Sequence, residues 1–406
     1  MQANSATVLV LNTGSSSIKF CLYSMTEEKL LLTGTLERIG DIDTRCVHQV
    51  FTTEGETKEH IENLPTADLD GYLNHIFTLL EKTKSRLAIE SLQAIGHRVV
   101  HGGELFHLPT VIDNHVIDGI RKMIPLAPLH NKACLAGIET ARQQYPQVPQ
   151  VAVFDTAYFQ TLPPHVCHYA LPTELYNRYH VRRYGFHGIS HQYVATEAAN
   201  YLCQPLSALK LISLHLGNGA SAAAILNGKC IDTSMGMTPL EGLIMGTRCG
   251  DIDPSIPFYL NKEAGMDFVE IEKLLNNDSG IKGLCGYKDM RDVHHQANLG
   301  NEQAKLAIDM YCYRIRKYIG AYFAALGGLD ALIFTAGVGE NDTHIRALIG
   351  SELSALGIGI DQSRNLPETS GISEINSNSS QVKVLVIPGN EELGIARETV
   401  SVLNRI

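Results

Sequence analysis

The chain opens on two short apolar runs joined by a polar turn. Residues 8–12 and 18–23 are apolar, and N-T-G-S-S-S links them. This pattern predicts a strand, a glycine–serine turn and a second strand. It returns about 200 residues later, where apolar runs at 211–216 and 222–226 flank G-N-G-A-S, and N-G then predicts a hairpin into 229–232. We infer an internal duplication, and two copies with a cleft between them fit the length of the chain.

The remaining hydrophobic pattern alternates between short apolar runs and segments with helical periodicity. Further strands are expected at 94–100, 150–154, 331–335 and 383–387, and helices at 67–82, 192–203 and 302–326. Residues 361–381 are polar and rich in Asn and Ser, so we expect a surface loop there. Strands that alternate with helices indicate an α/β architecture with helix-covered sheets.

Composition narrows the function classes. The chain has 406 residues, 44% hydrophobic and 19% charged, which is typical of a globular protein and excludes a disordered, collagen-like or coiled-coil chain. A net charge of −10 argues against nucleic acid as a partner. No apolar run reaches about 18 residues, so we expect no membrane span. The nine cysteines form no C-x-x-C pair, which indicates reduced thiols and a cytoplasmic location.

Three glycine-containing turns have the chemistry of phosphate binding. They lie at 12–17 with Lys19 nearby, at 215–219 and at 337–341. Glycine frees the backbone, and amides and hydroxyls can donate to phosphate oxygens. The alternatives are an ordinary hairpin turn for the first and a simple helix start for the third. No G-x-x-x-x-G-K-[ST] and no helix-opening G-x-G-x-x-G occurs, which disfavours P-loop and Rossmann folds.

Three cations flanked by glycines and two acids complete the candidate site. Arg98, His187 and Arg248 lie beside glycines, and a surface ion pair or a buried histidine is the alternative for each. Asp155 ends an apolar run, where α/β folds place catalytic groups, but it could also cap a helix. Glu391 follows P-G-N and could bind Mg²⁺, or could simply complement a helix dipole together with its neighbour Glu392.

These motifs resemble those of the acetate/propionate kinase family over nearly the whole chain. The matching segments are L-N-T-G-S-S-S-I-K, G-H-R-V-V-H-G-G, P-L-A-P-L-H-N, V-F-D-T-A, R-R-Y-G-F-H-G, H-L-G-N-G-A-S, D-T-S-M-G-M-T-P-L-E-G, G-T-R-x-G-D-I-D-P and N-E-E. The resemblance implies an α/β fold with two duplicated RNase H-like (actin-like ATPase) domains and a nucleotide cleft between them. The N-terminal domain, 1–155 plus about 390–406, would hold acetate and Mg²⁺, and 156–389 would bind ATP.

The resemblance also implies a reaction and assigns roles to residues. ATP and acetate would react reversibly, with Mg²⁺ or alternatively Mn²⁺, to give ADP and acetyl phosphate, and the enzyme would be a homodimer. The catalytic residues would be Asp155, His187 and Arg248, and the metal ligands Asn12 and Glu391. The substrate residues would be Arg98, Val100, Leu129, Phe186 and Pro239. The ATP-binding residues would be Ser15, Ser17, Lys19, His215, Leu216, Gly217, Asn218, Gly219, Asp289, Met290, Arg291, Gly337, Val338, Gly339, Glu340 and Asn341.

Chemistry refines two of these roles. A carboxylate nucleophile is already ionised at neutral pH, so we expect Asp155 to orient a group rather than remove a proton. Propionate-preferring members tend to have a smaller residue where this chain has Val100, which favours acetate, although one methylene changes binding by only about 1–3 kcal/mol. A propionate kinase, or another short-chain carboxylate kinase of the same fold, is the alternative.

A second alternative comes from a different class, a nucleotide-switch protein like the chaperone ATPases. That class needs an appended peptide-binding domain, and the chain leaves no room for one. Three departures from the family pattern stand out: Cys249 for serine, Ser255 for glycine, and Tyr287-Lys288 beside the adenosine region. The last of these leaves nucleotide-base preference open.

Overall fold

The structure is a computed structural model, and it describes residues 7–14, 16–39, 43–51, 57–87, 89, 92–367 and 371–405, without the side chains of 57, 58, 86 and 129. The chain forms two compact units. Unit 1 consists of residues 1–160 and 390–406, and unit 2 of residues 161–389. Among the described residues, no helix is both long and apolar enough to cross a membrane.

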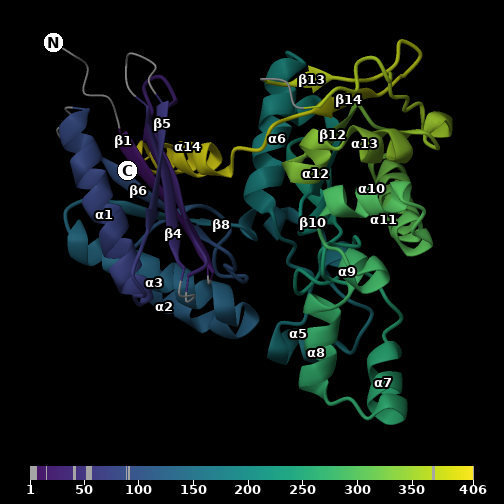
Figure 1. Cartoon of the computed structure of the whole chain (residues 1–406), viewed down its shortest axis with the longest axis horizontal. Helices are drawn as coiled ribbons and strands as arrows, with labels where there is room; N and C mark the ends of the chain where they lie inside the picture. The colour runs from purple at the N-terminus through teal and green to yellow at the C-terminus, as the bar shows by residue number, and fades with distance from the viewer. Residues whose placement is uncertain are drawn as a thin grey trace. The chain divides into compact units, whose positions relative to one another are not determined.

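Unit 1 is built on one eight-stranded sheet with the order β5-β4-β3-β2-β1-β6-β8-β7 (Figure 1). β1 pairs antiparallel with β2 but parallel with β6, and β6 pairs parallel with β8. The strands are β1 Thr7–Thr13, β2 Ser17–Ser24, β3 Lys29–Glu37, β4 Arg45–Phe51, β5 Thr57–Asn63, β6 Ala94–Val99, β7 Thr110–Val111 and β8 Gln150–Phe154.

Alternation along the strands separates the two faces of this sheet. Leu9, Leu11 and Ile95 point to one face and pack with Tyr72 of helix α1 and Ala141 of helix α3. The helices of unit 1 are α1 Leu69–Arg86, α2 Asn114–Lys122, α3 Pro128–Gln144 and α14 Glu391–Leu403, with short 3₁₀ turns at Ile124–Leu126 and Ala157–Thr161.

The C-terminal helix α14 covers the opposite face, where it contacts β1, β6 and β8 (Figure 1). Gly96 of β6 lies directly beneath it. A Cβ added at Gly96 would lie 2.8 Å from Cγ2 of Ile395 and would also collide with the Thr399 hydroxyl. The close approach of α14 to the sheet therefore requires a glycine at this position.

Unit 2 repeats the same strand pattern in a six-stranded sheet of order β11-β10-β9-β12-β14-β13. β9 pairs antiparallel with β10 and parallel with β12, which pairs parallel with β14, as in the core of unit 1. The duplication inferred from the two glycine-turn hairpins is thus confirmed in the topology. The strands are β9 Lys210–Leu216, β10 Ala220–Leu226, β11 Lys229–Thr233, β12 Ala331–Thr335, β13 Ser373–Glu374 and β14 Lys383–Val386.

The helices of unit 2 include α6, which packs on β9 and β12, and the long α11, which packs on β9 and β10. They are α4 Pro164–Cys167, α5 Thr173–Tyr179, α6 Gly188–Tyr201, α7 Ile256–Ala264, α8 Phe268–Asn277, α9 Gly280–Cys285, α10 Met290–Asn298, α11 Glu302–Leu326, α12 Ala336–Asn341 and α13 Thr343–Gly350, with 3₁₀ turns at Leu206–Ala208 and Ser354–Leu356.

Two expectations from the sequence need correction. The segment 361–381 is not loop throughout, because Ser373–Glu374 pairs with β14 as an edge strand and Ile375 is buried. The glycine cluster at 337–341 is not an open turn but forms helix α12, which Ala336 enters with a φ of +65°. Asp342 then caps α13, since its Oδ1 accepts from the Ile345 amide at 2.9 Å.

Candidate active site

Three predicted side chains of unit 1 lie at the carboxyl ends of neighbouring parallel strands. Asn12 is the penultimate residue of β1, Arg98 the penultimate residue of β6, and Asp155 follows β8 directly. Parallel strands present these ends at one edge of a sheet, which is where open α/β folds place ligands. The strand pairing therefore brings together residues that are 57 to 143 positions apart in the sequence.

Arg98 is the centre of this group. Its Nη2 donates to Asp155 Oδ2 at 2.9 Å, and its Nη1 lies 3.5 Å from Asn12 Oδ1. Asp155 is only 1% exposed. Coulombic attraction to Asp155 and Glu391 raises the pKa of Arg98 despite its burial, so the guanidinium stays charged. Its Nε is buried and has no hydrogen-bond partner among the described residues, so it is a donor that is still to be satisfied.

Glu391 begins helix α14 beside this cation. The helix is capped by Asn390, whose Oδ1 accepts from the Leu393 amide and from the Tyr23 hydroxyl. Glu391 Oε2 lies 3.9 Å from Arg98 Nε. Burial raises the pKa of Glu391 to about 7, Arg98 opposes this rise, and the charges of Asp155 and Glu392 add to it. The carboxylates here thus outnumber the nearby cations.

This donor set fits a hard divalent cation. The Asn12 amide oxygen and the Glu391 carboxylate are the oxygen ligands that Mg²⁺ prefers, and a cation would relieve the excess negative charge. Among the described residues, no three His, Cys, Asp or Glu side chains form a ready-made cluster. Protein ligands would therefore be few, as is usual for Mg²⁺ that is shared with phosphates and water.

The predicted acyl-tail residues are divided between the two units. Val100 follows β6 and is buried. The next backbone unit, at His101, is fixed by Asn131, which accepts from its amide at 3.0 Å and donates to its carbonyl at 2.9 Å. The side chain of Leu129 lies outside the described residues. Phe186 and Pro239 belong to unit 2.

The first predicted phosphate turn is described only in part. Ser15 lies outside the described residues. Ser17 and Lys19 lie on β2, where Lys19 pairs with Asn12 across the hairpin and is exposed. The hairpin thus places the Lys19 position directly opposite the predicted metal ligand.

In unit 2, three histidines meet near Ser221, at the end of β9 and the beginning of β10. His187 precedes helix α6 with a φ of +61°, which is unusual for a residue other than glycine. Its Nδ1 lies 2.9 Å from Ser221 Oγ, and its ring stacks on His215 with centroids 4.1 Å apart. His191 is fully buried behind them, and burial holds its pKa well below the usual value, so it is a neutral member of this network.

Arg248 lies beside His187. A Cβ added at Gly219 would lie 3.4 Å from Arg248 Nη1 and 3.5 Å from His187 Nε2, so both groups border the space above this glycine. Arg248 Nη1 donates to the Pro239 carbonyl at 3.3 Å. Among the described residues no carboxylate pairs with Arg248. Burial without a counter-ion lowers the pKa of Arg248, and a bound anion would reverse that shift.

A cavity of about 620 Å³ opens next to this group in unit 2. Its lining combines glycine backbone with apolar and polar side chains: Gly217, Asn218, Gly246, Ile281, Lys288, Asp289, Met290, Arg291, His294, Tyr311, Gly337, Val338, Asn341, Asp342 and Thr343. The lining thus includes predicted ATP-binding residues from all three segments of unit 2. Within the described part of the chain, His215, Leu216, Gly219, Gly339 and Glu340 are outside this lining.

Several lining residues were not predicted. His294 Nε2 and Asp342 Oδ2 are 2.7 Å apart, which makes a hydrogen bond at the cavity wall. Asp342 was considered only as a helix cap, and His294 has no motif around it. Its position on α10, one turn after Asp289–Arg291, is the only signal that points to the cavity.

Comparison with known proteins agrees with this description. Two solved structures cover 98% of the chain with a TM-score of 0.89: an acetate kinase of Porphyromonas gingivalis, 41% identical over all of that chain, and a propionate kinase of Francisella tularensis, 42% identical over 99% of that chain. A curated acetate kinase of Syntrophobacter fumaroxidans is 49% identical over 399 residues, 98% of this chain and 97% of its own length.

The duplicated sheets and the polar groups at their strand ends define an α/β protein of the actin-like ATPase fold, the fold of those solved structures. The sequence profile of the acetokinase family matches residues 7–397. The chain therefore belongs to the acetokinase family.

Proposed function

We propose that this protein is an acetate kinase, which transfers the γ-phosphoryl group of ATP to acetate and forms acetyl phosphate and ADP reversibly. The observation that carries the proposal is Arg248. It is a partly buried cation without a carboxylate partner among the described residues, next to His187 and two residues from Gly246 in the cavity lining. Such a cation is suited to a transferring phosphoryl group, whose charge spreads over its equatorial oxygens.

Each unit would bind one of the two substrates. In unit 2, the cavity would hold the nucleoside and its phosphates, with glycine backbone close to the anionic groups. In unit 1, Arg98 would bind the acceptor carboxylate. Its Nη2 is occupied by Asp155, so the unpartnered Nε is the donor that we assign to acetate. Asp155 would thus hold Arg98 in place and would not act as a base.

The metal in this proposal is Mg²⁺, with Mn²⁺ as an alternative, held by Asn12 and Glu391. A bound Mg²⁺ supplies charge stabilisation to phosphate oxygens. The protein would supply the other charges. Glu391 carries the negative charge that retains the ion, and Arg248 and His187 would face the phosphoryl group. Positioning and electrostatics are sufficient for a reaction that needs little covalent catalysis.

Acetate is the proposed acceptor rather than propionate. Val100 is 7% exposed and lies two residues after Arg98, so a bulky β-branched side chain limits the space for an acyl tail. The preference should be modest, because a methylene group changes binding in such a pocket by only about 1–3 kcal/mol. Equal kcat/KM values for acetate and propionate would refute this part of the proposal.

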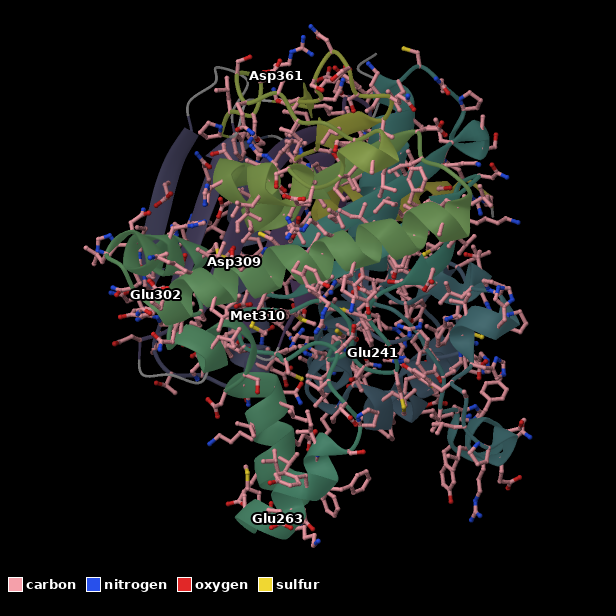
Figure 2. All side chains as sticks on the ribbon, turned by 90° about the vertical axis from the view of Figure 1, so that its right-hand side faces the viewer. Glu241, Glu263, Glu302, Asp309, Met310 and Asp361 are labelled. Carbon is pink, nitrogen blue, oxygen red and sulfur yellow. The ribbon has the colours of Figure 1, made fainter. Side chains whose placement is uncertain are left out.

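We also propose a homodimer in the cytoplasm. Large apolar side chains are exposed on α7, α8 and α11, and Figure 2 shows α11 lying across one side of unit 2 with Met310 on it. Exposed apolar patches of this kind mark protein–protein contacts. Phe268→Asp should shift the species measured by light scattering from dimer to monomer. All nine cysteines, which are all described, are free thiols, and this favours a reducing compartment.

The deciding experiment traps acetyl phosphate as its hydroxamate, with ATP, Mg²⁺ and a panel of carboxylates. Acetate should give the highest kcat/KM. Arg248→Ala should lower kcat by about 10³-fold while nucleotide binding persists, because the cavity side chains remain. If no carboxylate yields a hydroxamate, the proposed function is wrong.

A further inference from the structure

A polar cluster in unit 2 involves none of the groups assigned to ligands. It consists of Arg183, Glu241 and Tyr169, which we call the Arg183 cluster. Arg183 Nη2 donates to Glu241 Oε1 at 2.6 Å, and the Tyr169 hydroxyl donates to Glu241 Oε2. The guanidinium also lies over the Tyr169 ring, 5.6 Å from its centroid. Arg183 is largely buried, with 16% of its side chain exposed.

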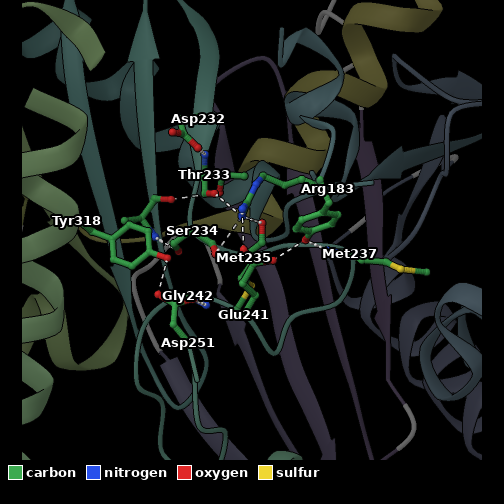
Figure 3. A network of polar contacts seen from close by, with 12 residues as sticks. Arg183, Asp232, Thr233, Ser234, Met235, Met237, Glu241, Gly242, Asp251 and Tyr318 are labelled. Atoms are coloured by element: carbon green, nitrogen blue, oxygen red, sulfur yellow. Dashed lines mark hydrogen bonds and ion pairs between the residues drawn. The ribbon is translucent and has the colours of Figure 1, made fainter. Parts of the chain in front are cut away.

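The cluster holds the backbone that leaves strand β11. Arg183 Nη1 donates to three consecutive carbonyls, those of Thr233, Ser234 and Met235, at 3.0, 3.3 and 3.1 Å (Figure 3). The Tyr169 hydroxyl accepts from the Met237 amide at 2.9 Å. The Arg183 guanidinium thus fixes the beginning of the loop 234–240 and also binds Glu241, the residue that follows the loop. A lysine ammonium lacks the planar fork that this arrangement uses.

This loop contacts Arg248 and the backbone just before His187. Its Gly236 carbonyl accepts from the amides of Tyr184 and Gly185 at 3.0 and 3.2 Å, immediately before Phe186 and His187. Its Pro239 carbonyl accepts from Arg248 Nη1 at 3.3 Å. The loop is therefore a common support for the His187 backbone and the Arg248 side chain.

The same loop is continuous with the segment that carries Arg248. Gly242 follows Glu241, and its amide donates to Asp251 Oδ1 at 2.8 Å while its carbonyl accepts from the Asp251 amide at 3.0 Å (Figure 3). Asp251 is held in turn by the Tyr318 hydroxyl of α11 at 2.9 Å. These two hydrogen bonds join the ends of the segment 242–251, next to Glu241 of the Arg183 cluster.

We propose that Arg183 and Glu241 are positioning residues, which set Arg248 and His187 at the distance and angle that phosphoryl transfer needs. The inference rests on the proposed kinase function. It predicts that the cluster acts through Arg248, and not merely through the stability of unit 2. Positional errors of about 1 Å in a reacting group cost on the order of 100-fold in rate, which sets the scale of the effect.

The test is a double-mutant cycle. Arg183→Met should lower kcat by about 10- to 100-fold, with the KM for ATP changed less than about twofold, because the cavity lining is left intact. In an Arg248→Ala background the same change should lower kcat by a clearly smaller factor, since one of the two groups that it positions is already gone and only its effect on His187 remains. Arg364→Met is the matched control. Arg364 also donates to a loop carbonyl of unit 2, that of Asn376 at 3.0 Å, but none of its hydrogen bonds to described residues leads to Arg248.

Equal losses in the two backgrounds would overturn the proposal and leave the cluster with a purely structural role. If Arg183→Met does not fold, Glu241→Gln keeps the side-chain volume and serves in the same cycle, with the same outcomes. A wild-type protein that makes no acetyl phosphate would refute the proposed function instead, so the two failures can be told apart.

Discussion

Asp155→Asn tests how unit 1 holds its substrate group. The change keeps the size of the side chain and removes its charge. Asp155 is almost fully buried, and its Oδ2 pairs with Arg98 Nη2 at 2.9 Å. After the substitution the guanidinium would turn toward Glu391, which lies 3.9 Å from Nε, and the donor assigned to acetate would be occupied.

The size of the effect follows from the bond that is lost. A charge-assisted hydrogen bond contributes about 1.5–3 kcal/mol, and breaking a buried ion pair costs about 3–5 kcal/mol. Glu391 would remain as a partial replacement for Asp155 beside Arg98. We therefore expect the variant to lose roughly 2–4 kcal/mol of transition-state stabilisation. At about 1.4 kcal/mol for each factor of ten, kcat/KM for acetate should fall by about 30- to 1,000-fold.

The assay is hydroxamate formation between pH 5 and 9 at saturating Mg²⁺, so that Glu391 stays ionised. If Asp155 only orients Arg98, the acid limb of the kcat profile should have the same midpoint in the variant as in the wild type. A midpoint that moves, or a variant activity restored by an added external base, would refute this reasoning and indicate proton transfer by Asp155.

Three further predictions concern Glu391, Gly96 and Arg291. The pKa of Glu391 is raised to about 7 from 4.5, so the folded state binds this proton more tightly, and stability is lost as pH rises through 7. Without divalent cations, Glu391→Gln should therefore unfold at a higher temperature than the wild type at pH 8, with the difference shrinking below pH 5. Gly96→Ala should destabilise unit 1 by about 1–3 kcal/mol in urea unfolding, because its Cβ would overlap with helix α14. Arg291→Ala should raise the KM for ATP several-fold without changing the melting temperature, since the Asp289–Arg291 pair lies at the exposed mouth of the cavity.

Periodicity located the elements whose burial pattern is simple. The helix at 302–326 and the strands at 150–154 and 331–335 have the bounds that the sequence predicted. Both strands are buried at every residue, and the helix repeats buried positions from Ala304 to Leu326. β3 and β4 were missed although their burial alternates. In β3 threonines and Glu37 occupy the outward positions after Leu31, and in β4 polar residues lie on both faces, with His48 buried and Arg45 and Gln49 outward. Residues 188–191 were left out of the predicted helix, but they form the first turn of α6 after a left-handed His187.

The candidate site was predictable where glycines flank a charged side chain, as at Arg98 and Arg248. It was not predictable where a side chain acts on distant backbone. Arg183 binds carbonyls about 50 residues away, and Asn131 holds the backbone at His101, 30 residues away. Carbonyl acceptors have no signature in a sequence, because every residue carries one.

The return of α14 to the first sheet also has a consequence during synthesis. Residues 391–403 cover β1, β6 and β8, yet they leave the ribosome after all three strands and after unit 2. Unit 2 is one continuous segment and can fold as soon as it has emerged. The face of the N-terminal sheet around Gly96 lacks its covering helix until residues 391–403 emerge, so the nascent chain carries an uncovered apolar surface while unit 2 is made. Synthesis of unit 1 thus begins first, but its fold is completed only after unit 2 has emerged. A truncation after residue 389 should give a protein whose first unit is a target for chaperones and proteases.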